Sequence, residues 1–252
     1  MTAFVVARNS YLLLMLLLAV ADYFFLSLSP WVYLALTLLY ILLVVAGSSV
    51  MSLNFFTRSY TRGRGNTIAL TFDDGPSAEH TPAVLEVLDK WGATATFFCI
   101  GERMEQNKAL VRKIKEKGHR IGNHSYTHSN LFSIFGKNMV VDEIEKTNRL
   151  IQELTGEECR LFRPPYGVLN PPIAKAAAAC GMQVIGWNIR SFDTTTKDYQ
   201  KVVERVLPRI GPGAVLLLHD DRENTPKIVD AILAHASRLN LRYIQAQELI
   251  HE

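Results

Sequence analysis

The hydrophobic pattern of the first 57 residues differs from that of the rest of the chain. Apolar residues run almost without interruption through residues 11–29 and 31–51, which Pro30 separates. Each stretch has about the length of a helix that crosses a hydrocarbon core of roughly 30 Å. We therefore predict a membrane anchor of two transmembrane helices in residues 1–57 and a separate folded domain in residues 58–252.

From Thr67 onward, short apolar runs rich in β-branched and aromatic residues alternate with longer stretches of helical periodicity. This alternation is typical of βα units, whose strands form a parallel sheet. The strands fit either a closed barrel or an open, doubly wound sheet. The predicted strands are Ile68–Phe72, Thr94–Ile100, Arg120–Asn123, Leu161–Arg163, Gln183–Trp187, Ala214–Leu218 and Arg242–Ile244. The predicted helices are Pro82–Trp91, Glu105–Lys117, Val140–Leu154, Pro171–Cys180, Asp198–Pro208 and Pro226–Leu239.

Three of these helices begin at a proline that follows a residue able to cap a helix. These residues are Thr81, Asn170 and Thr225. Proline suits the first helical position, and the side chain of the preceding Thr or Asn accepts a hydrogen bond from an otherwise unpaired N–H. We predict all three as N-caps.

Acidic, basic and imidazole side chains follow most of the predicted strands. They are Asp73 and Asp74 after the first, His124 after the third, Arg163 at the end of the fourth, Asp193 shortly after the fifth and His219 after the sixth. In barrels and open α/β sheets, active sites lie at the carboxyl ends of parallel strands. Because so many strands contribute such side chains, the sequence favours a closed ring of strands over an open sheet.

Charged residues are confined almost entirely to the predicted domain. Of the 27 Lys and Arg and 24 Asp and Glu residues, only Arg8 and Asp22 lie in the first 57 positions. The net charge of +3 is small, and basic residues are mixed with acids, which argues against nucleic-acid binding. Cys99, Cys159 and Cys180 form no CxxC pair, so we predict buried thiols of a reducing compartment.

Arginines that flank the two apolar stretches bear on the orientation of the anchor. Arg8 precedes the first stretch, and Arg58, Arg62 and Arg64 follow the second. By the positive-inside rule, this arrangement favours a cytoplasmic location for both ends of the anchor and for the domain. An exported domain would require an inverted hairpin or a single true span.

The first apolar stretch also permits a different interpretation. Asp22 weakens it as a span, because a carboxylate at membrane depth is costly unless it faces a partner or lies near an interface. The alternative is a secretory signal, with Arg8 as its basic end and Ala19–Ala21 as its cleavage site. The apolar run continues past this site, which favours the anchor.

His124 and His128 form a candidate metal-binding motif. Histidines at i and i+4 share one face of a helical turn, with Cβ atoms roughly 5–6 Å apart, which suits two imidazoles on one ion. A carboxylate of the Asp73–Asp74 pair would complete three protein ligands and leave positions for water and substrate. The alternatives are two polar histidines in a loop and, for the acids with Gly75, an ordinary turn.

Five short motifs occur in the order found in one known family. They are TFDDGP at Thr71–Pro76, HSYTH at His124–His128, RPPYG at Arg163–Gly167, SFDT at Ser191–Thr194 and LLLHD at Leu216–Asp220. With these motifs the chain resembles the polysaccharide deacetylase family, the NodB-homology or carbohydrate esterase 4 group, across roughly residues 66–250. The resemblance implies a distorted (β/α)7 barrel, here preceded by the N-terminal transmembrane hairpin, and this agrees with the strand pattern.

The resemblance also implies roles for the residues at the strand ends. Asp73 matches the general base, His219 matches the general acid, and Asp74, His124 and His128 match the ligands of a divalent metal, usually zinc. The metal and preorganised donors would stabilise the negative charge that develops on an amide oxygen. Asp73 would accept a proton from the attacking water, and His219 would protonate the leaving amine.

Three further positions match the family pattern. Arg163 resembles the arginine that orients the base, the backbone N–H of Tyr166 would help to hold the oxyanion, and Leu217 would help to line the pocket for the acyl methyl group.

The fourth motif departs from the family, since the usual Trp after the final Asp is missing. Asp193 remains available to orient His219, but one wall of the pocket differs. Arg190 adds a cation near the rim. One hypothesis is that Arg190 meets an anionic feature of the substrate, such as a phosphate, and the alternative is a surface salt bridge.

These expectations describe a membrane-anchored, metal-dependent hydrolase that removes N-acetyl groups from amino sugars of a glycan, such as peptidoglycan or a chitin-like oligosaccharide. A deacylase of a lipid-linked amino sugar at the inner leaflet would reconcile the resemblance with the cytoplasmic orientation. A non-catalytic carbohydrate-binding protein is the alternative from another class.

Overall fold

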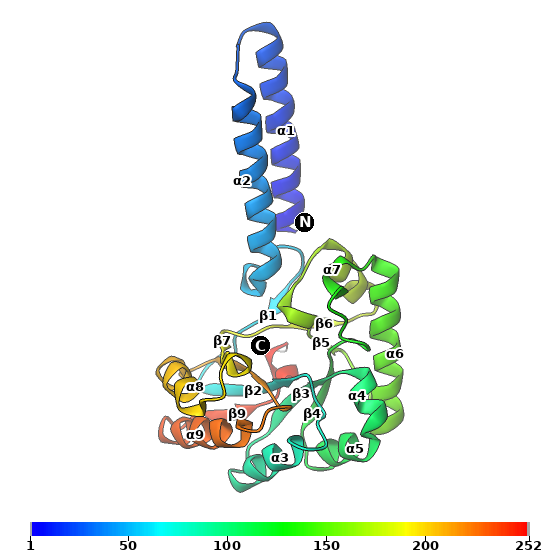
Figure 1. Cartoon of the computed structure of the whole chain (residues 1–252), viewed down its shortest axis with the longest axis vertical. Helices are drawn as coiled ribbons and strands as arrows, with labels where there is room; N and C mark the ends of the chain where they lie inside the picture. Colours follow the sequence, from blue (N-terminus) through cyan, green and yellow to red (C-terminus); the bar gives the residue numbers. More distant parts are fainter. Residues whose placement is uncertain (1, 251–252) are drawn as a thin grey trace.

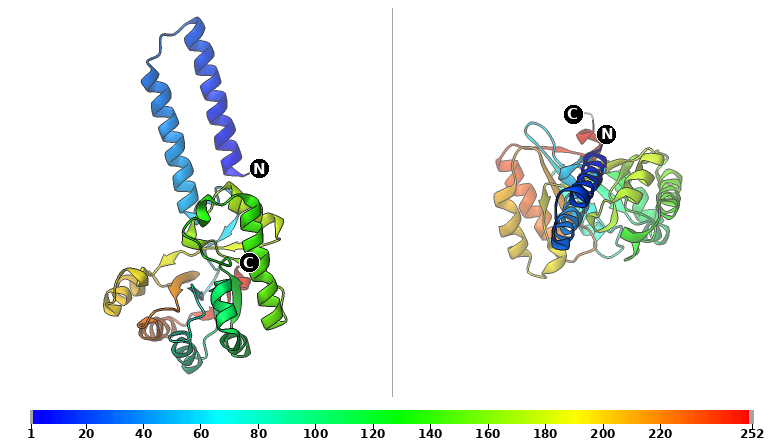
Figure 2. Two further views of the ribbon diagram at one scale, coloured as in Figure 1. Left: turned by 45° about the vertical axis from the view of Figure 1, so that its right-hand side comes forward. Right: turned by 90° about the horizontal axis from the view of Figure 1, so that it is seen from above.

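A helical hairpin stands on an α/β domain in the computed structural model, which describes residues 2–250 (Figures 1 and 2). The hairpin consists of α1 (Ala3–Phe24) and α2 (Pro30–Ser49). Both helices are long and apolar enough to cross a membrane, a property that a signal sequence shares. Tyr11 joins them, because its ring stacks on Tyr40 with centroids 4.3 Å apart and its hydroxyl lies 2.9 Å from that of Thr37.

The hairpin helices differ in extent from the predicted spans. The first begins at Ala3 rather than at residue 11, because the Thr2 hydroxyl accepts a hydrogen bond from the first turn and the helix continues through Arg8. Asp22 lies close to the turn between the helices. Its carboxylate accepts hydrogen bonds from the Leu28 N–H (2.6 Å) and the Tyr33 hydroxyl (3.2 Å). This carboxylate therefore has partners at the end of the first helix.

All strands of the domain run parallel in one curled sheet. Its order is β1-β6-β5-β4-β3-β2-β8-β7, and β9 pairs with the beginning of β2. Within residues 2–250 no ladder joins β1 to β7, so the sheet is a half-barrel consistent with the predicted (β/α)7 fold. The strands are β1 (Ser59–Tyr60), β2 (Thr67–Asp73), β3 (Ala95–Cys99), β4 (Arg120–Asn123), β5 (Leu161–Phe162), β6 (Gln183–Ile185), β7 (Ile189–Arg190), β8 (Ala214–His219) and β9 (Arg242–Ile244).

Helices cover the outer face of the sheet (Figure 2). They are α3 (Thr81–Lys90), α4 (Gly101–Gln106), α5 (Lys108–Glu116), α6 (Lys137–Thr155), α7 (Pro171–Ala179), α8 (Tyr199–Val206) and α9 (Thr225–Arg238). Side chains of a strand alternate between faces. In β2, Leu70 and Phe72 therefore pack in the layer under the helices, whereas Ala69 joins the smaller cluster inside the barrel. Cys99 and Cys159 are buried, Cys180 is half-buried, and all three are free thiols.

The sequence-based prediction was wrong at two strands and one helix. Each predicted strand is present, but β1 and β7 were missed because two residues are too short for a periodic pattern. The helix predicted over 105–117 consists of α4 and α5, which are separated at Asn107, where the backbone (φ −129°, ψ 41°) leaves the helical region.

Only one of the three predicted N-caps is correct. The Asn170 side chain accepts a hydrogen bond from the Ile173 N–H at 3.1 Å. Thr81 and Thr225 are instead the first residues of their helices. Their hydroxyls have other partners near the carboxyl end of β8, because Thr81 donates to Asp220 and Thr225 donates to the His219 carbonyl. Both threonines therefore fasten a helix to this strand.

The stacked, fully buried rings of Phe72 and Phe97 provide a test of the core. Their centroids lie 4.9 Å apart. We expect Phe97→Ala to destabilise the domain by about 3–5 kcal/mol, because it removes buried contacts and leaves a cavity. Leu239→Ala, at an exposed position, is the control and should change the stability by less than about 0.5 kcal/mol. Chemical denaturation of the full chain in detergent would measure both, and equal stabilities would contradict this account of the core.

Candidate active site

The sequence-predicted polar residues gather at the carboxyl ends of the strands. Asp73 ends β2, His219 ends β8, and Arg163 follows β5. Loops after β4 and β7 contribute the remaining members, which are His124, His128 and Asp193. The register explains the juxtaposition, because Asp73 is paired with His219 across neighbouring parallel strands.

Asp73 and Asp74 reach the same group of residues although they are consecutive. In a regular strand their side chains would point to opposite faces. Asp74, however, has a φ of 71°, in the left-handed region that non-glycine residues rarely adopt. The two carboxylates thereby both approach His124, at 3.8 Å for Asp73 and 3.5 Å for Asp74. The pair is therefore not an ordinary surface turn.

His124 and His128 lie in a loop, so the predicted helical turn is wrong. Ser125 and His128 have φ values of 67° and 51°, which fold the loop back on itself. The two imidazole centroids nevertheless lie 4.9 Å apart. The Nδ1 of His124 is 2.7 Å from the carbonyl oxygen of Arg163, so Nδ1–H donates there and Nε2 is left to face Asp74.

Two residues that the sequence analysis did not assign hold this loop. The buried Asn123 side chain accepts from the Ser125 N–H at 2.8 Å and donates to the Ile144 carbonyl at 2.9 Å. Glu143, on α6, accepts hydrogen bonds from the Tyr126 and Thr127 N–H groups, both at 2.9 Å. Asn123 directly precedes the histidine motif, and this position could have indicated its role. Glu143 is remote from the motif in sequence, so no sequence signal indicated its role.

Asp74, His124 and His128 fit the coordination of one divalent ion. Their potential ligand atoms all lie within 4.8 Å of one another. The Asp74 Oδ1 is 3.5 Å from the Nε2 of His124 and 3.4 Å from the Nε2 of His128. Tetrahedral ligands about 2.0–2.2 Å from zinc are separated from each other by roughly 3.3–3.6 Å. One carboxylate oxygen and two imidazole nitrogens are also a donor set that zinc accepts.

Charges within the cluster favour an anionic Asp74. Burial would raise the pKa of this carboxyl, but the hydrogen bond to His124 and the charges of the nearby histidines lower it well below its usual range. Burial and the charge of His124 together lower the pKa of His128. A low pKa keeps His128 neutral, and a neutral imidazole is the form that binds a metal.

Arg163 is fully buried and holds Asp73. Its Nη1 donates to the Asp73 Oδ1 at 2.7 Å and to the Thr71 hydroxyl at 2.8 Å. Burial lowers the pKa of the guanidinium, while the Asp73 charge opposes that shift. A buried ion pair of this kind fixes the orientation of the carboxylate and leaves its second oxygen directed toward His124.

Asp193 holds His219 through two contacts. Its Oδ1 accepts from the His219 Nδ1–H at 2.7 Å, and its Oδ2 accepts from the His219 main-chain N–H at 2.8 Å. Burial would lower the pKa of His219, but the hydrogen bond and charge of Asp193, with the charges of Asp73 and Asp74, raise it to about 9. His219 is therefore protonated at neutral pH, and its ring orientation is fixed.

Tyr166 and Leu217 are two further residues that the motifs predict for the site. Tyr166 has a φ of 61°, and its ring centroid is 4.8 Å from that of His128. Its hydroxyl donates to the Asn130 side chain at 2.7 Å. Leu217 is buried in β8 two residues before His219, so the two side chains face the same side of the sheet.

Arg190 is exposed on β7 and contacts aromatic rings. Its guanidinium carbon lies 4.9 Å from the centroid of Phe192 and 5.9 Å from that of Trp187. The expected alternative, a surface salt bridge, is not formed within residues 2–250. The chain thus presents two aromatic side chains and a cation beside the motif that lacks the family's Trp.

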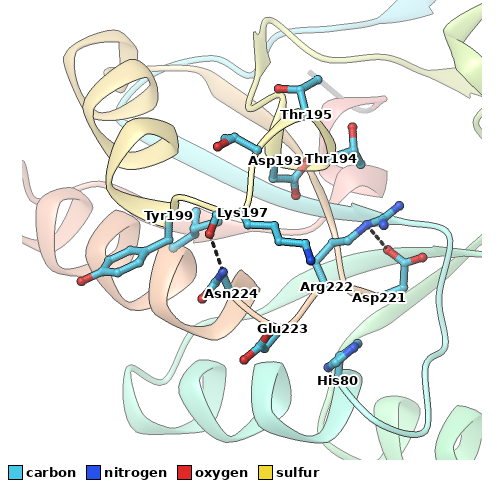
Figure 3. A pocket seen from close by; sticks show the side chains of 12 residues that line it. His80, Asp193, Thr194, Thr195, Lys197, Tyr199, Asp221, Arg222, Glu223 and Asn224 are labelled. Atoms are coloured by element: carbon cyan, nitrogen blue, oxygen red, sulfur yellow. Dashed lines mark hydrogen bonds and ion pairs between the residues drawn. The ribbon is translucent and has the colours of Figure 1, made fainter.

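A polar cavity of about 380 Å³ opens beside Asp193 (Figure 3). Hydroxyl, amide and charged side chains from the loops after β7 and β8 line most of it. They include Thr194, Thr195, Thr196, Lys197, Arg222 and Asn224. The Asn224 amide donates to the Lys197 carbonyl at 2.8 Å and thereby joins the two loops. Such a wall offers a ligand hydrogen-bonding groups together with apolar surface, to which Tyr199 and Ile228 contribute.

Comparisons with known proteins identify the family of the chain. Residues 61–185 match the family model described as "Polysaccharide deacetylase". The chain is 34% identical over 185 residues to the peptidoglycan-N-acetylglucosamine deacetylase PgdA of Listeria monocytogenes, covering 73% of this chain and 39% of that protein. It is 33% identical over 191 residues to a peptidoglycan-N-acetylglucosamine deacetylase of Bacillus cereus, covering 73% of this chain and 87% of that protein.

Similar solved structures include a carbohydrate esterase and a pseudoenzyme. A family 4 carbohydrate esterase from Streptomyces lividans, in complex with acetate, has a TM-score of 0.66 and 32% identity, with 72% of this chain and 93% of that chain covered. A CE4 family pseudoenzyme from Bacillus anthracis has a TM-score of 0.70 and 29% identity, with coverages of 75% and 68%. A mutant of the pseudoenzyme with restored activity is equally similar, at a TM-score of 0.71.

Removal of one ligand provides a direct test of the metal centre. We expect the chain to bind one zinc ion, and His128→Ala to weaken binding by more than about a hundredfold, since loss of a mere supporting contact costs 10–100-fold. His235→Ala, on α9, is the matched control and should bind as the wild type does. Calorimetric titration would measure the affinities. Unchanged zinc affinity in His128→Ala would contradict this site.

The raised pKa of His219 can be tested without turnover. In metal-free protein, Asp193→Asn removes a negative charge and weakens the imidazolium, so the pKa should fall from about 9 by at least about one unit. His219 then loses its proton at a lower pH than in the wild type. An NMR titration of the imidazole would measure this, with Asp198→Asn, an exposed cap of α8, as control. An unchanged titration in Asp193→Asn would refute the assigned cause.

Proposed function

The chain belongs to the polysaccharide deacetylase family, and on that basis we propose that it is a metal-dependent hydrolase that removes N-acetyl groups from amino sugars of a glycan. One observation carries the proposal. The Asp74–His124–His128 cluster lies near two oriented groups, Asp73 held by Arg163 and His219 held by Asp193. Known relatives supply the substrate class, because those described above are named as deacetylases of peptidoglycan N-acetylglucosamine.

The three ligands would hold a divalent ion, for which zinc fits best. When bound, such an ion acts as a Lewis acid that polarises the amide carbonyl of the substrate. Asp73 acts as general base, because Arg163 occupies one of its oxygens and leaves the other to accept a proton from the attacking water. The backbone N–H of Tyr166 is proposed to donate to the oxyanion that forms.

His219 acts as general acid in this proposal. It is protonated at neutral pH and donates its Nδ1–H to Asp193, so its Nε2–H is left to protonate the departing amine. This transfer turns a poor leaving group into a neutral amine. Leu217, on the same face of β8, would contact the acyl methyl group.

The polar cavity beside Asp193 is proposed to receive a neighbouring part of the glycan. Its hydroxyl and amide groups suit hydrogen bonds to sugar hydroxyls. Arg190 is proposed to meet an anionic feature of the substrate, such as a phosphate. Its guanidinium is exposed and, within the described residues, contacts aromatic rings and forms no ion pair with a carboxylate. Its positive charge is therefore available to bind an anionic group of the substrate.

We further propose that residues 1–57 are a two-span anchor and residues 58–252 the deacetylase domain. The length and apolarity of α1 and α2 support this, since most of their surface is exposed. The flanking arginines favour a cytoplasmic domain. A lipid-linked amino sugar at the inner leaflet is accordingly a second candidate substrate, and it would be deacylated before export.

A non-catalytic carbohydrate-binding protein is the competing function. The likeness to a pseudoenzyme supplies its main support, because a chain of this fold need not be active. Against it stand the five acids and histidines of the site. Two of them, Asp73 and His219, are held by the polar side chains of Arg163 and Asp193, and packing alone does not require polar groups there.

Acetate release would separate these functions. We expect the full chain in detergent to release acetate from chitooligosaccharide, peptidoglycan or a lipid-linked N-acetylamino sugar. Chelation should abolish release, and Asp73→Asn should lower the rate by about 10²–10⁴-fold, because it removes the general base. Asp198→Asn serves as a folded control. The absence of release from all three substrates, with metal bound, would favour the carbohydrate-binding protein.

A further inference from the structure

An exposed apolar surface lies on the loop that follows the metal-binding histidines. Leu131 and Ile134 on the loop, with Met139 in the first turn of α6, form this surface, here called the apolar loop patch, and their exposed fractions are 58%, 75% and 52%. The loop is fixed in place, because Phe132, between the first two, is fully buried in the core. A fixed cluster of exposed large apolar side chains is typical of an interaction surface.

The patch adjoins the foot of the helical hairpin. The Ser133 carbonyl, within the loop, accepts a hydrogen bond from the Asn170 side chain at 2.6 Å. The preceding residue, Leu169, donates its N–H to the Ser48 carbonyl in the last turn of α2 at 2.9 Å. Figures 1 and 2 show α7, which begins after Asn170, beside the lower end of the hairpin. Two hydrogen bonds therefore connect the patch to the end of a predicted membrane span.

The patch also adjoins the metal centre. Asn130, next to Leu131, accepts a hydrogen bond from the Tyr166 hydroxyl at 2.7 Å. The same hydroxyl lies 3.3 Å from the His128 carbonyl, and the Tyr166 ring lies against the His128 imidazole. Tyr166 is itself 46% exposed. A chain of hydrogen bonds therefore leads from α2 through the loop that carries the patch to His128.

We propose that the apolar loop patch docks on the lipid bilayer that holds the hairpin, and that it keeps the metal centre at the membrane surface. This inference rests on the proposed anchor and narrows the substrate to amino sugars attached to membrane lipid. Three features favour a bilayer as the occupant: the continuity with α2, the apolar character of the patch, and the exposed Lys137 beside it, which suits an anionic headgroup.

Depth-dependent quenching tests the docking directly. The full chain, with Cys180→Ser to remove the half-buried thiol, is reconstituted in vesicles of phosphatidylcholine and phosphatidylglycerol. A fluorophore is attached at Ile134→Cys or, as control, at Leu239→Cys, an exposed apolar position at the end of α9. We expect nitroxide-bearing lipid to quench the label at 134 and to leave the label at 239 unchanged.

Two outcomes of the quenching experiment would overturn the docking. The first is equal quenching of both labels by aqueous iodide, with no effect of the nitroxide lipid at 134. The second is protection of the label at 134 that depends on protein concentration in the vesicles, which would assign the patch to a second copy of the chain.

Turnover tests the consequence for the substrate. We expect the double variant Leu131→Asn, Ile134→Asn to deacetylate lipid-linked N-acetylglucosamine in vesicles at a rate lowered about tenfold. Each substitution removes an apolar side chain from the proposed contact with the bilayer and so weakens the docking. Its rate on soluble chitooligosaccharide should be unchanged, and Leu239→Asn should change neither rate. Equal rates for wild type and double variant on the lipid-linked sugar would refute the role of the patch.

The two proposals fail in different ways. A wild-type chain that releases no acetate from either substrate contradicts the proposed function. The quenching experiment tests the docking independently of this result. A chain that is active on the soluble sugar but shows no lipid quenching at 134 contradicts the docking alone.

Discussion

The buried guanidinium of Arg163 is the contact on which the site depends. It donates to Asp73 on β2, while its Nε and Nη2 donate to the carbonyls of Ile185 and Gly186 at the end of β6, at 3.1 and 2.9 Å. Its own carbonyl accepts the Nδ1–H of His124. The Arg163 side chain thus orients Asp73 and joins strands on opposite sides of the curled sheet, and its carbonyl leaves the Nε2 of His124 to face Asp74. A charge without these partners would be costly to bury.

Much of the fold could be predicted because the strands are long or strongly apolar. β2 and β8 are buried over almost their whole length, and their runs of Ile, Leu, Val and Phe are visible in the sequence. The missed strands are pairs of residues whose extended backbone depends on a neighbour: β1 on β6, and β7 on β8. The misassigned caps at Thr81 and Thr225 have a similar cause, since their hydroxyls donate to Asp220 and to the His219 carbonyl at the carboxyl end of β8.

The sequence motifs predicted which residues form the candidate site, but they did not predict how these residues are arranged. The motifs contain all three proposed metal ligands, and their spacing suggested a helical turn at His124–His128. The loop conformation instead depends on Asn123 and on Glu143, a residue of the following helix. Similarly, the motif does not reveal that Asp74 adopts a left-handed backbone. Such conformations cost about 1–3 kcal/mol and persist where surrounding contacts determine them, so local pattern alone does not predict them.

The segment between the hairpin and the domain limits how far the catalytic end can travel. Met51, Phe55 and Phe56 are buried in the core of the domain, and the Phe55 carbonyl accepts the N–H of Phe4 at the start of α1. A flexible segment over 50–58 could extend to roughly 30 Å, but here it is folded against both parts. A domain held in this way on a membrane would search for substrate in two dimensions. Its encounter rate would then depend on the number of substrate molecules per area of bilayer, and a distant polymer strand would lie out of reach.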